Sequence, residues 1–240
     1  MLGIKEELYM IWLFILALIP LSRILFYIVL FIVHRKENIV GEIGRNVADA
    51  MLGKVGLQDE VKVIVADDED SYDPATNIVC LSKKNNRKTI ASVAIAIHEV
   101  GHALQMNSKW MLYRFRCKII VMKGPLIYIT AILAVLGFGI RICGMLAVVS
   151  LICLLVCTVV EVVVEIDASI KGCRNYQKHF KTNSIEMRKI RFFLGVAALT
   201  YFADIINCIY MVVRLVIHML NNGEEKKNEK RRNGWELYKM

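Results

Sequence analysis

Cysteine pairs that could build a disulfide framework or a thiolate zinc site are missing from this sequence. Seven cysteines occur in 240 residues, an odd number, and none belongs to a Cys-x-x-Cys pair. Cys143, Cys153 and Cys157 lie in apolar runs, where cysteine packs as a small apolar residue. The pattern therefore indicates neither a disulfide-stapled fold nor a zinc finger.

Patterns typical of nucleic-acid binding are also missing, although the formal net charge is +9 at pH 7. The basic residues form no patch interleaved with aromatic residues, and no known nucleic-acid motif is present. Lysine and arginine gather instead between apolar runs and in a basic tail at residues 220–240. Membrane proteins carry such residues in cytoplasmic loops, close to anionic lipid. We therefore expect the chain to contact a lipid bilayer and not nucleic acid.

Long apolar runs dominate the composition, which is 56% hydrophobic. Residues 8–33 form the first run, which is long enough to cross a bilayer. Two glutamates precede it and no small-x-small cleavage site is evident, so an uncleaved anchor is favoured over a signal peptide. Residues 119–140 and 143–164 form two further runs, and Arg141 and Gly144 mark the short break between them. These two runs predict a transmembrane hairpin.

A fourth apolar run, residues 192–213, contains Asp204 and Asn207. Hydropathy favours a full crossing, whereas the aspartate favours packing beside the hairpin with its polar face covered. Basic residues follow the first and third runs, and the loop within the hairpin carries only Arg141. The positive-inside rule then places residues 34–118 in the cytoplasm and the amino terminus outside. A full fourth crossing would leave the basic tail outside, which argues against it.

The segment His98-Glu99-Val100-Gly101-His102 reads His-Glu-x-x-His within an apolar stretch of helical character. Residues four apart share one helix face, so both imidazoles can reach one Zn²⁺ at about 2.0–2.1 Å. Glu99 is rotated off the metal, where it can take a proton from a bound water. The arrangement is typical of zinc peptidases. The alternative is a set of buried polar residues satisfied by other partners.

The polar segment at residues 34–118 is long enough for a small α+β unit resting on the membrane. Hydrophobic spacing predicts a helix at residues 42–54 and strands at 61–66 and 78–82, with a polar loop at 67–77. The strand that precedes the His-Glu-x-x-His helix could offer an exposed edge to an extended peptide. The alternative is an ordinary hairpin that protects one side of the helix.

A catalytic zinc of this type needs a third protein ligand and an open position for water. Glu161, Glu165 and Asp167 are the contenders. Glu161 lies deeper in the apolar run, and Asp167 is turned about 200° from Glu165 on an ideal helix. Glu165 lies at the end of the third run, and two crossings return the chain to the side of the histidines. Glu165 is therefore the predicted third ligand.

Five segments spread across the chain form a recognisable pattern in a fixed order. They are Tyr72-Asp73-Pro74-Ala75-Thr76-Asn77, residues 79–82, residues 98–105, residues 165–169 and Ala197-Ala198-Leu199-Thr200-Tyr201. In these segments the chain resembles the YugP-type family of membrane zinc metallopeptidases and, more distantly, HtpX-like membrane proteases. The segments near residues 72 and 197 are more specific to the family than the metal motif itself.

This resemblance implies peptidase chemistry with one catalytic zinc ion. His98, His102 and Glu165 would be the metal ligands, and Glu99 would be the catalytic base. The HtpX-like pattern has an aspartate four residues after the third ligand, where this chain has Ser169. Either Asp167 or Ser169 would then hold a ligand imidazole.

Other polar residues are harder to place from the sequence. His34 and His218 lie far from the motifs in the chain and are expected at the membrane interface. The donor that would stabilise the oxyanion is left among four unranked candidates, which are Tyr113, Arg114, Tyr176 and His179.

The predicted fold is a membrane α-helical protein of three to four transmembrane helices, with a small α+β gluzincin-like zinc-peptidase unit at one membrane face. It would act on a peptide or protein substrate. The predicted segments are an anchor (1–33), the metal-binding α+β segment (34–118), the hairpin (119–164), the third-ligand segment with a membrane-face helix (165–191), a fourth apolar helix (192–219) and the basic tail (220–240).

Three other classes of protein fit less well. An intramembrane protease carries its motif inside a spanning helix, but the apolar lead-in at residues 90–97 is too short and no Asp-Gly partner motif follows. A non-catalytic zinc-binding scaffold would need a fourth protein ligand, and no well-spaced cysteine or histidine offers one. A zinc transporter has only Asp204 and Asn207 in its favour.

Overall fold

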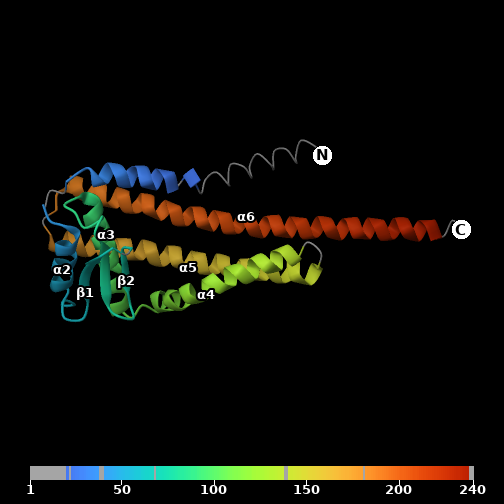
Figure 1. Ribbon diagram of the computed structural model, residues 1–240, viewed down its shortest axis with the longest axis horizontal. Helices are drawn as coiled ribbons and strands as arrows, with labels where there is room; N and C mark the ends of the chain where they lie inside the picture. The colour runs from blue at the N-terminus through green and yellow to red at the C-terminus, as the bar shows by residue number, and fades with distance from the viewer. Residues whose placement is uncertain are drawn as a thin grey trace. The chain divides into compact units, whose positions relative to one another are not determined.

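The structure is a computed structural model that describes residues 20–237 except 22, 38–40, 68, 138–139 and 181, with side chains described to residue 219. The contacts between residues divide the chain into two compact units, and some helices contribute to both. Unit 1 holds Met1–Lys118 and Val160–Ala203, and unit 2 holds Ile119–Val159 and Asp204–Met240. Most of the structure is helical, with one small sheet (Figure 1).

The sheet in unit 1 has three strands in the order β1-β3-β2, where β1 is Lys62–Ala66, β2 is Ser71–Asp73 and β3 is Ile78–Ser82. Strand β3 pairs in parallel with β1 and antiparallel with β2. The two longer strands match the predicted ones, but the strand before the His-Glu-x-x-His helix is central. Of the two alternatives that the sequence left open for this strand, the exposed edge is therefore excluded.

Strand β2 lies inside the segment predicted to be a loop. Its middle residue, Tyr72, is buried, while Ser71 and Asp73 are exposed, so the strand has one inward side chain and no readable alternation. A tight turn follows, in which the Asp73 carboxylate accepts hydrogen bonds from the Ala75 amide (2.9 Å) and the Thr76 hydroxyl (2.6 Å). Asn77, with φ of 54°, completes the turn in a conformation that asparagine tolerates. The family-specific segment at residues 72–77 thus builds the β2–β3 connection.

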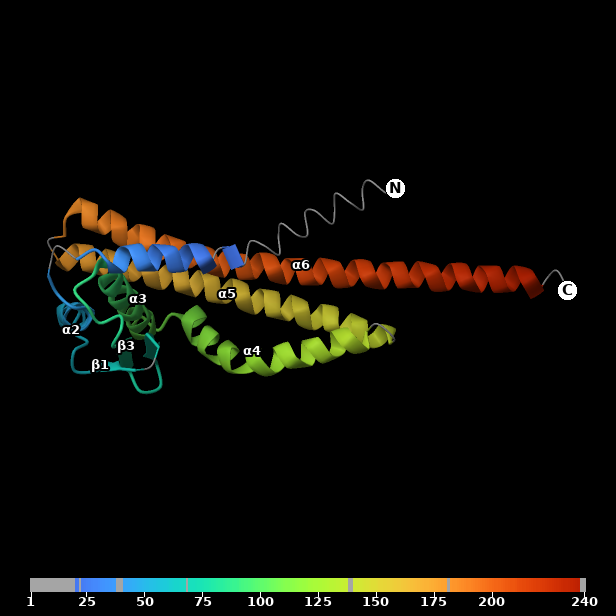
Figure 2. The same cartoon turned by 45° about the horizontal axis from the view of Figure 1, so that its top comes forward.

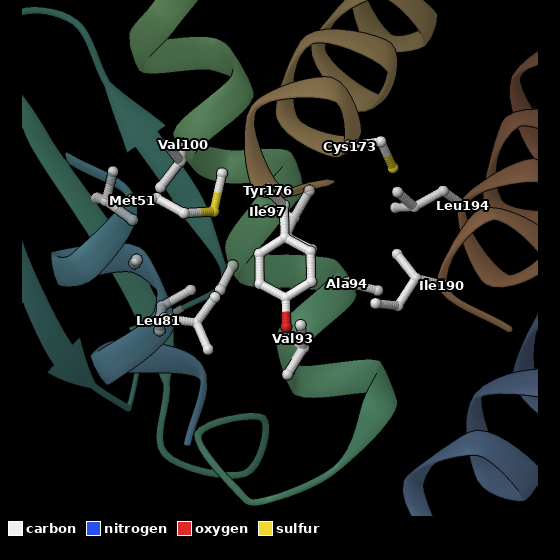
Figure 3. Packing of buried hydrophobic residues seen from close by; sticks show 14 of the residues in the cluster. Met51, Leu81, Val93, Ala94, Ile97, Val100, Cys173, Tyr176, Ile190 and Leu194 are labelled. Carbon is white, nitrogen blue, oxygen red and sulfur yellow. The ribbon is translucent and has the colours of Figure 1, made fainter. Parts of the chain in front are cut away.

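Helix α3, Ile90–Asn107, is the centre of unit 1 and carries the His-Glu-x-x-His motif. Thr89 caps its amino terminus by accepting a hydrogen bond from the Ser92 amide at 3.2 Å. Helix α2, Gly44–Lys54, and the sheet pack on one side of α3, as Figures 1 and 2 both show. In Figure 3, Met51 and Leu81 approach α3 from that side and Cys173 and Ile190 from the other. Buried apolar side chains that pack on both sides of α3 therefore hold this helix in place within unit 1.

Three long helices complete the chain: α4 (Met111–Leu136), α5 (Arg141–His179) and α6 (Ser184–Leu237). Each contains an apolar stretch long enough to cross a membrane, and only 11%, 39% and 22% of these stretches is buried inside the protein. Their apolar side chains thus lie on the surface, where a bilayer would cover them. The fold therefore has three candidate membrane-spanning helices.

The predicted segments differ in detail from these helices. Helix α5 continues through Glu165 to His179, so the third predicted ligand lies within a helix and not after its end. The α6 backbone stays helical through most of the basic tail, to Leu237. Most of the predicted first span lies outside the described residues; the part described is a shorter apolar helix, Arg23–His34.

Unit 2 contains the tight connection between α4 and α5. A Cβ atom added to Gly137 would lie 2.7 Å from the Cα atom of Gly144, so position 137 requires glycine for this close backbone approach. The prediction marked the break by Arg141 and Gly144, which both lie in the first turn of α5. The hairpin therefore turns at the amino-terminal side of the predicted break.

Candidate metal centre

The structure brings His98, His102 and Glu165 together, although the chain separates them by up to 67 residues. Their ligand-type atoms all lie within 4.8 Å of one another. Nε2 of His98 lies 3.0 Å from Oε2 of Glu165, and Nε2 of His102 lies 3.4 Å from the same oxygen. Two imidazole nitrogens and one carboxylate form a donor set that fits a zinc ion.

Two glycines allow this convergence by letting α3 and α5 touch through their backbones. A Cβ atom on Gly101 would lie 2.1 Å from the carbonyl oxygen of Ala168, and one on Gly172 would lie 2.1 Å from that of Ile97. Real Cβ atoms do not approach so closely. Gly101 lies inside the His-Glu-x-x-His motif, so the same segment supplies the imidazoles and the close helix contact.

The His98 ring is held by Ser169. Its Nδ1 lies 2.9 Å from the Ser169 hydroxyl, which itself donates to the Glu165 carbonyl oxygen at 3.1 Å. Since the hydroxyl proton is used by that carbonyl, the serine oxygen accepts from Nδ1–H of His98. The Nε2 lone pair of His98 is then left for a metal.

The His102 ring is held by Gln105 through the same logic. Nδ1 of His102 donates to Oε1 of Gln105 at 2.9 Å. The Gln105 amide nitrogen donates to the carbonyl oxygen of Val164 and to Oδ2 of Asp167, both at 2.8 Å. These two hydrogen bonds fix the orientation of the Gln105 amide group, so that its oxygen faces the His102 imidazole. Of the two predicted imidazole partners, Ser169 therefore acts directly on His98, and Asp167 acts on His102 through Gln105.

Two residues not expected at the site contact Glu165. The Arg116 guanidinium forms an ion pair with Oε1, and the Tyr201 hydroxyl donates to Oε2 at 3.3 Å. Tyr201 belongs to one of the segments that carry the family resemblance, and this resemblance was the feature of the sequence that could have pointed to it. Arg116 resembles any other basic residue near a membrane interface, and the sequence offered no signal for it.

Glu99 is only 7% exposed and lies beside the two histidines. Burial raises the pKa of its carboxyl group, and the charges of His98 and His102 oppose that change. Burial tends to lower the pKa of His98, but its hydrogen bond to Glu165 and the neighbouring carboxylates outweigh this effect and raise the pKa. A raised pKa at Glu99 is a property expected of a group that exchanges protons near neutral pH.

A cavity of about 250 Å³ opens beside these residues, and we call it the metal cavity. Polar groups from Asp70, Asn85 and Tyr201 line it together with His98, Glu99, Glu165 and Ser169. Its apolar walls come from the helix Arg23–His34, from α3 and from α6. These wall residues are Phe26, Leu30, Ile95, Phe193, Leu194, Ala197 and Ala198.

The other predicted polar residues lie elsewhere. None of the four unranked donors is among the residues that line the metal cavity. Tyr113 is buried with its ring 5.7 Å from that of His102, and Tyr176 stacks on Phe180. His34 is closer to the site than expected, because its ring contacts Thr89 at 3.2 Å and Asn85 at 3.0 Å.

Comparison with known proteins agrees with this geometry. The sequence family described as "Putative neutral zinc metallopeptidase" matches residues 8–220. The chain belongs to this family. It is also 28% identical over 197 residues to the "Putative membrane protease YugP" of Bacillus subtilis (strain 168), covering 77% of this chain and 84% of the relative. No solved structure matches the chain.

Proposed function

We propose that this protein is a membrane-bound zinc-dependent metalloendopeptidase of gluzincin type. His98, His102 and Glu165 would hold one zinc ion, and Glu99 would be the general base. The observation that supports the proposal best is the convergence of both Nε2 atoms on one Glu165 oxygen, with Glu99 buried beside them. Family membership supports the same chemistry.

The bound zinc ion would polarise the scissile carbonyl and lower the pKa of a water molecule to about 7. Glu99 accepts the proton of the attacking water and passes it to the leaving amine. Ser169 and Gln105 keep the two imidazoles protonated on Nδ1 and oriented. The Tyr201 hydroxyl lines the metal cavity and is the protein donor best placed to stabilise the oxyanion.

A non-catalytic zinc scaffold is less well supported. A structural zinc site is closed by four protein ligands, whereas a catalytic site keeps one position open. In the described part of the chain, the group at this site has three members, and a cavity lies beside it. The cavity favours access for water and a peptide.

The substrate would approach at the level of the membrane. One wall of the metal cavity comes from α6, a candidate spanning helix, and another from the apolar helix Arg23–His34. Membrane proteins or peptides at the bilayer surface therefore fit the site. The distribution of basic residues supports a multi-pass protein of the cell membrane with the metal centre on the cytoplasmic face.

Metal analysis and a cleavage assay on purified protein in detergent test the proposal. Wild-type protein should contain one zinc per chain and cleave casein or a membrane-protein substrate. Glu99→Gln removes the proton acceptor but no ligand, so it should keep zinc and lose turnover by several orders of magnitude. Equal turnover in the two proteins would sink the enzymatic proposal.

A further inference from the structure

A second cavity, of about 380 Å³, lies between α5 and α6 within unit 1, and we call it the α5–α6 groove. Apolar side chains of Ile170 and Cys173 form its α5 wall, and Leu194 and Gly195 belong to its α6 wall. It shares three lining residues with the metal cavity, so the two cavities are neighbours. The shared residues are Ser169, Leu194 and Ala198.

The groove has one cationic end. Arg174 follows Ile170 by about one helical turn, and Arg191 precedes Gly195 by about one turn, so both arginines lie toward the α5–α6 connection. Both are exposed. Arg191 also donates to Oε1 of Gln177 at 2.7 Å, which ties the two helices together there. None of the described residues that line the groove is acidic, so its charge complements an anion.

The dimensions match a short stretch of peptide. Arg174 lies nine residues after Glu165 on the same helix, which is about 13 Å along its axis at about 1.5 Å per residue. An extended peptide advances about 3.3 Å per residue, so about four residues cover this length. A chain that leaves the metal centre along the groove would reach the arginines within that span.

We propose that the α5–α6 groove is a substrate subsite. It takes an apolar side chain close to the scissile bond, and Arg174 and Arg191 pair with a carboxylate within about four residues of that side chain. The carboxylate belongs to an Asp or Glu side chain or to a free carboxyl terminus. This inference rests on the proposed peptidase function and names the class of peptide that the site prefers.

The wall shared with the metal cavity favours a peptide over a lipid as the occupant. Ser169 lines the groove and also holds the His98 ring, so a residue of the groove wall contacts a predicted zinc ligand. A phospholipid or fatty acid would share the apolar chain and the anionic group but would need no continuity with the metal. The experiment must therefore distinguish a lipid bound in the groove from a peptide bound there.

Gly195 offers a direct way to fill the groove. A Cβ atom added there meets nothing within 4 Å, and Gly195 lines the groove, so the backbone admits a leucine whose side chain begins at the groove wall. Gly53 is the matched control, because it is another exposed helical glycine with nothing within 4 Å of its Cβ position. Similar melting temperatures for Gly195→Leu and Gly53→Leu would show that both variants fold.

Peptide binding is measured by fluorescence anisotropy on full-length, zinc-loaded Glu99→Gln protein in detergent, so that no peptide is cleaved. The labelled peptides carry one Phe and one Glu, in either order and zero to four residues apart, in a Ser/Ala background. Replacing Phe by Ala, or Glu by Gln, should weaken binding by about three- to tenfold in the preferred spacing. Gly195→Leu should remove the Phe preference, and Arg174→Gln with Arg191→Gln should remove the Glu preference alone.

A second set of peptides separates the two sources of the carboxylate, which are an acidic side chain and a free carboxyl terminus. Each peptide is made with a free or an amidated carboxyl terminus, and with or without the Glu. Several results would overturn the subsite: no peptide binding up to about 1 mM, preferences unchanged by the groove variants, or oleate binding lost in Gly195→Leu while peptide preferences persist. The measurement needs no turnover. Wild-type protein without peptidase activity would therefore sink the proposed function and leave this test intact.

Discussion

Gly101 lies against Ala168 so closely that a Cβ atom on the glycine would come within 2.1 Å of the alanine carbonyl oxygen. This contact holds the motif helix against the helix that carries Glu165. Gly101→Ala should push the two helices apart, which lowers stability by about 1–3 kcal/mol through overpacking and weakens zinc binding. Zinc content and melting temperature check the result. Gly53→Ala, at an open position, is the control; full zinc occupancy in Gly101→Ala would contradict the prediction.

Glu165 is expected to be indispensable for zinc. Glu165→Ala should leave a two-histidine site that holds the metal poorly and should leave Arg116 without its ion pair. Glu161→Ala, one turn earlier on the same helix, is the control and should keep the metal. Zinc titration of the two variants decides between them. An empty Glu161→Ala and a fully loaded Glu165→Ala would reverse the assignment.

Gln105 should contribute strongly to zinc affinity, although it is not itself a predicted ligand. Gln105→Ala removes the acceptor for Nδ1–H of His102 and should cost about 10–100-fold in zinc affinity. Asp167→Asn should cost less, because Asp167 acts on His102 only through that amide. A competition titration with a zinc-binding dye measures both. A larger loss in the Asp167 variant would contradict the proposed chain of hydrogen bonds.

Tyr201→Phe should keep zinc and lower kcat by about 10–100-fold, since it removes one donor from the site and no ligand. Tyr210→Phe, on the same helix in unit 2, is the control. Metal analysis beside peptide turnover distinguishes the two roles of Tyr201. Loss of zinc with normal turnover per bound metal would show that the hydroxyl serves only Glu165.

Zinc affinity should fall as the solution is acidified through the raised pKa of His98. A ligand imidazole must be neutral to bind the metal. Because the hydrogen bond to Glu165 and the nearby carboxylates raise the pKa of His98 above 6.5 in the metal-free protein, protons compete with zinc already above that pH. Titrations between about pH 5 and 8 measure this. Affinity that stays constant until well below pH 6.5 would contradict the prediction.

Much of the local structure follows from patterns within short segments. The motif helix, strands β1 and β3 and the apolar helices have clear periodicity or length, and the sequence predicted them. Strand β2 has one buried side chain, so its pattern is too short to read. The central place of β3 depends on its pairing with β2, which is why the sequence could not decide whether β3 has an exposed edge.

The contacts that organise the metal centre join residues far apart in the chain, and no local pattern encodes them. Arg116 meets Glu165 across 49 positions and Gln105 meets Asp167 across 62. Both look like ordinary polar residues in their own segments. The glycines at 101 and 172 show their role only when the two helices are placed together. Tyr201 was visible through the family resemblance but not through its chemistry.

The separation of the ligands along the chain also has a consequence for biogenesis. His98 and Glu165 are 67 positions apart, and all of α4 and much of α5, two candidate spanning helices, lie between them. A ribosome therefore completes both histidines long before the third ligand exists. A nascent chain that stops within the intervening helices carries the motif but cannot assemble the three-ligand centre. The proposed three-ligand centre can therefore assemble only after α4 and the part of α5 that ends at Glu165 have been synthesised.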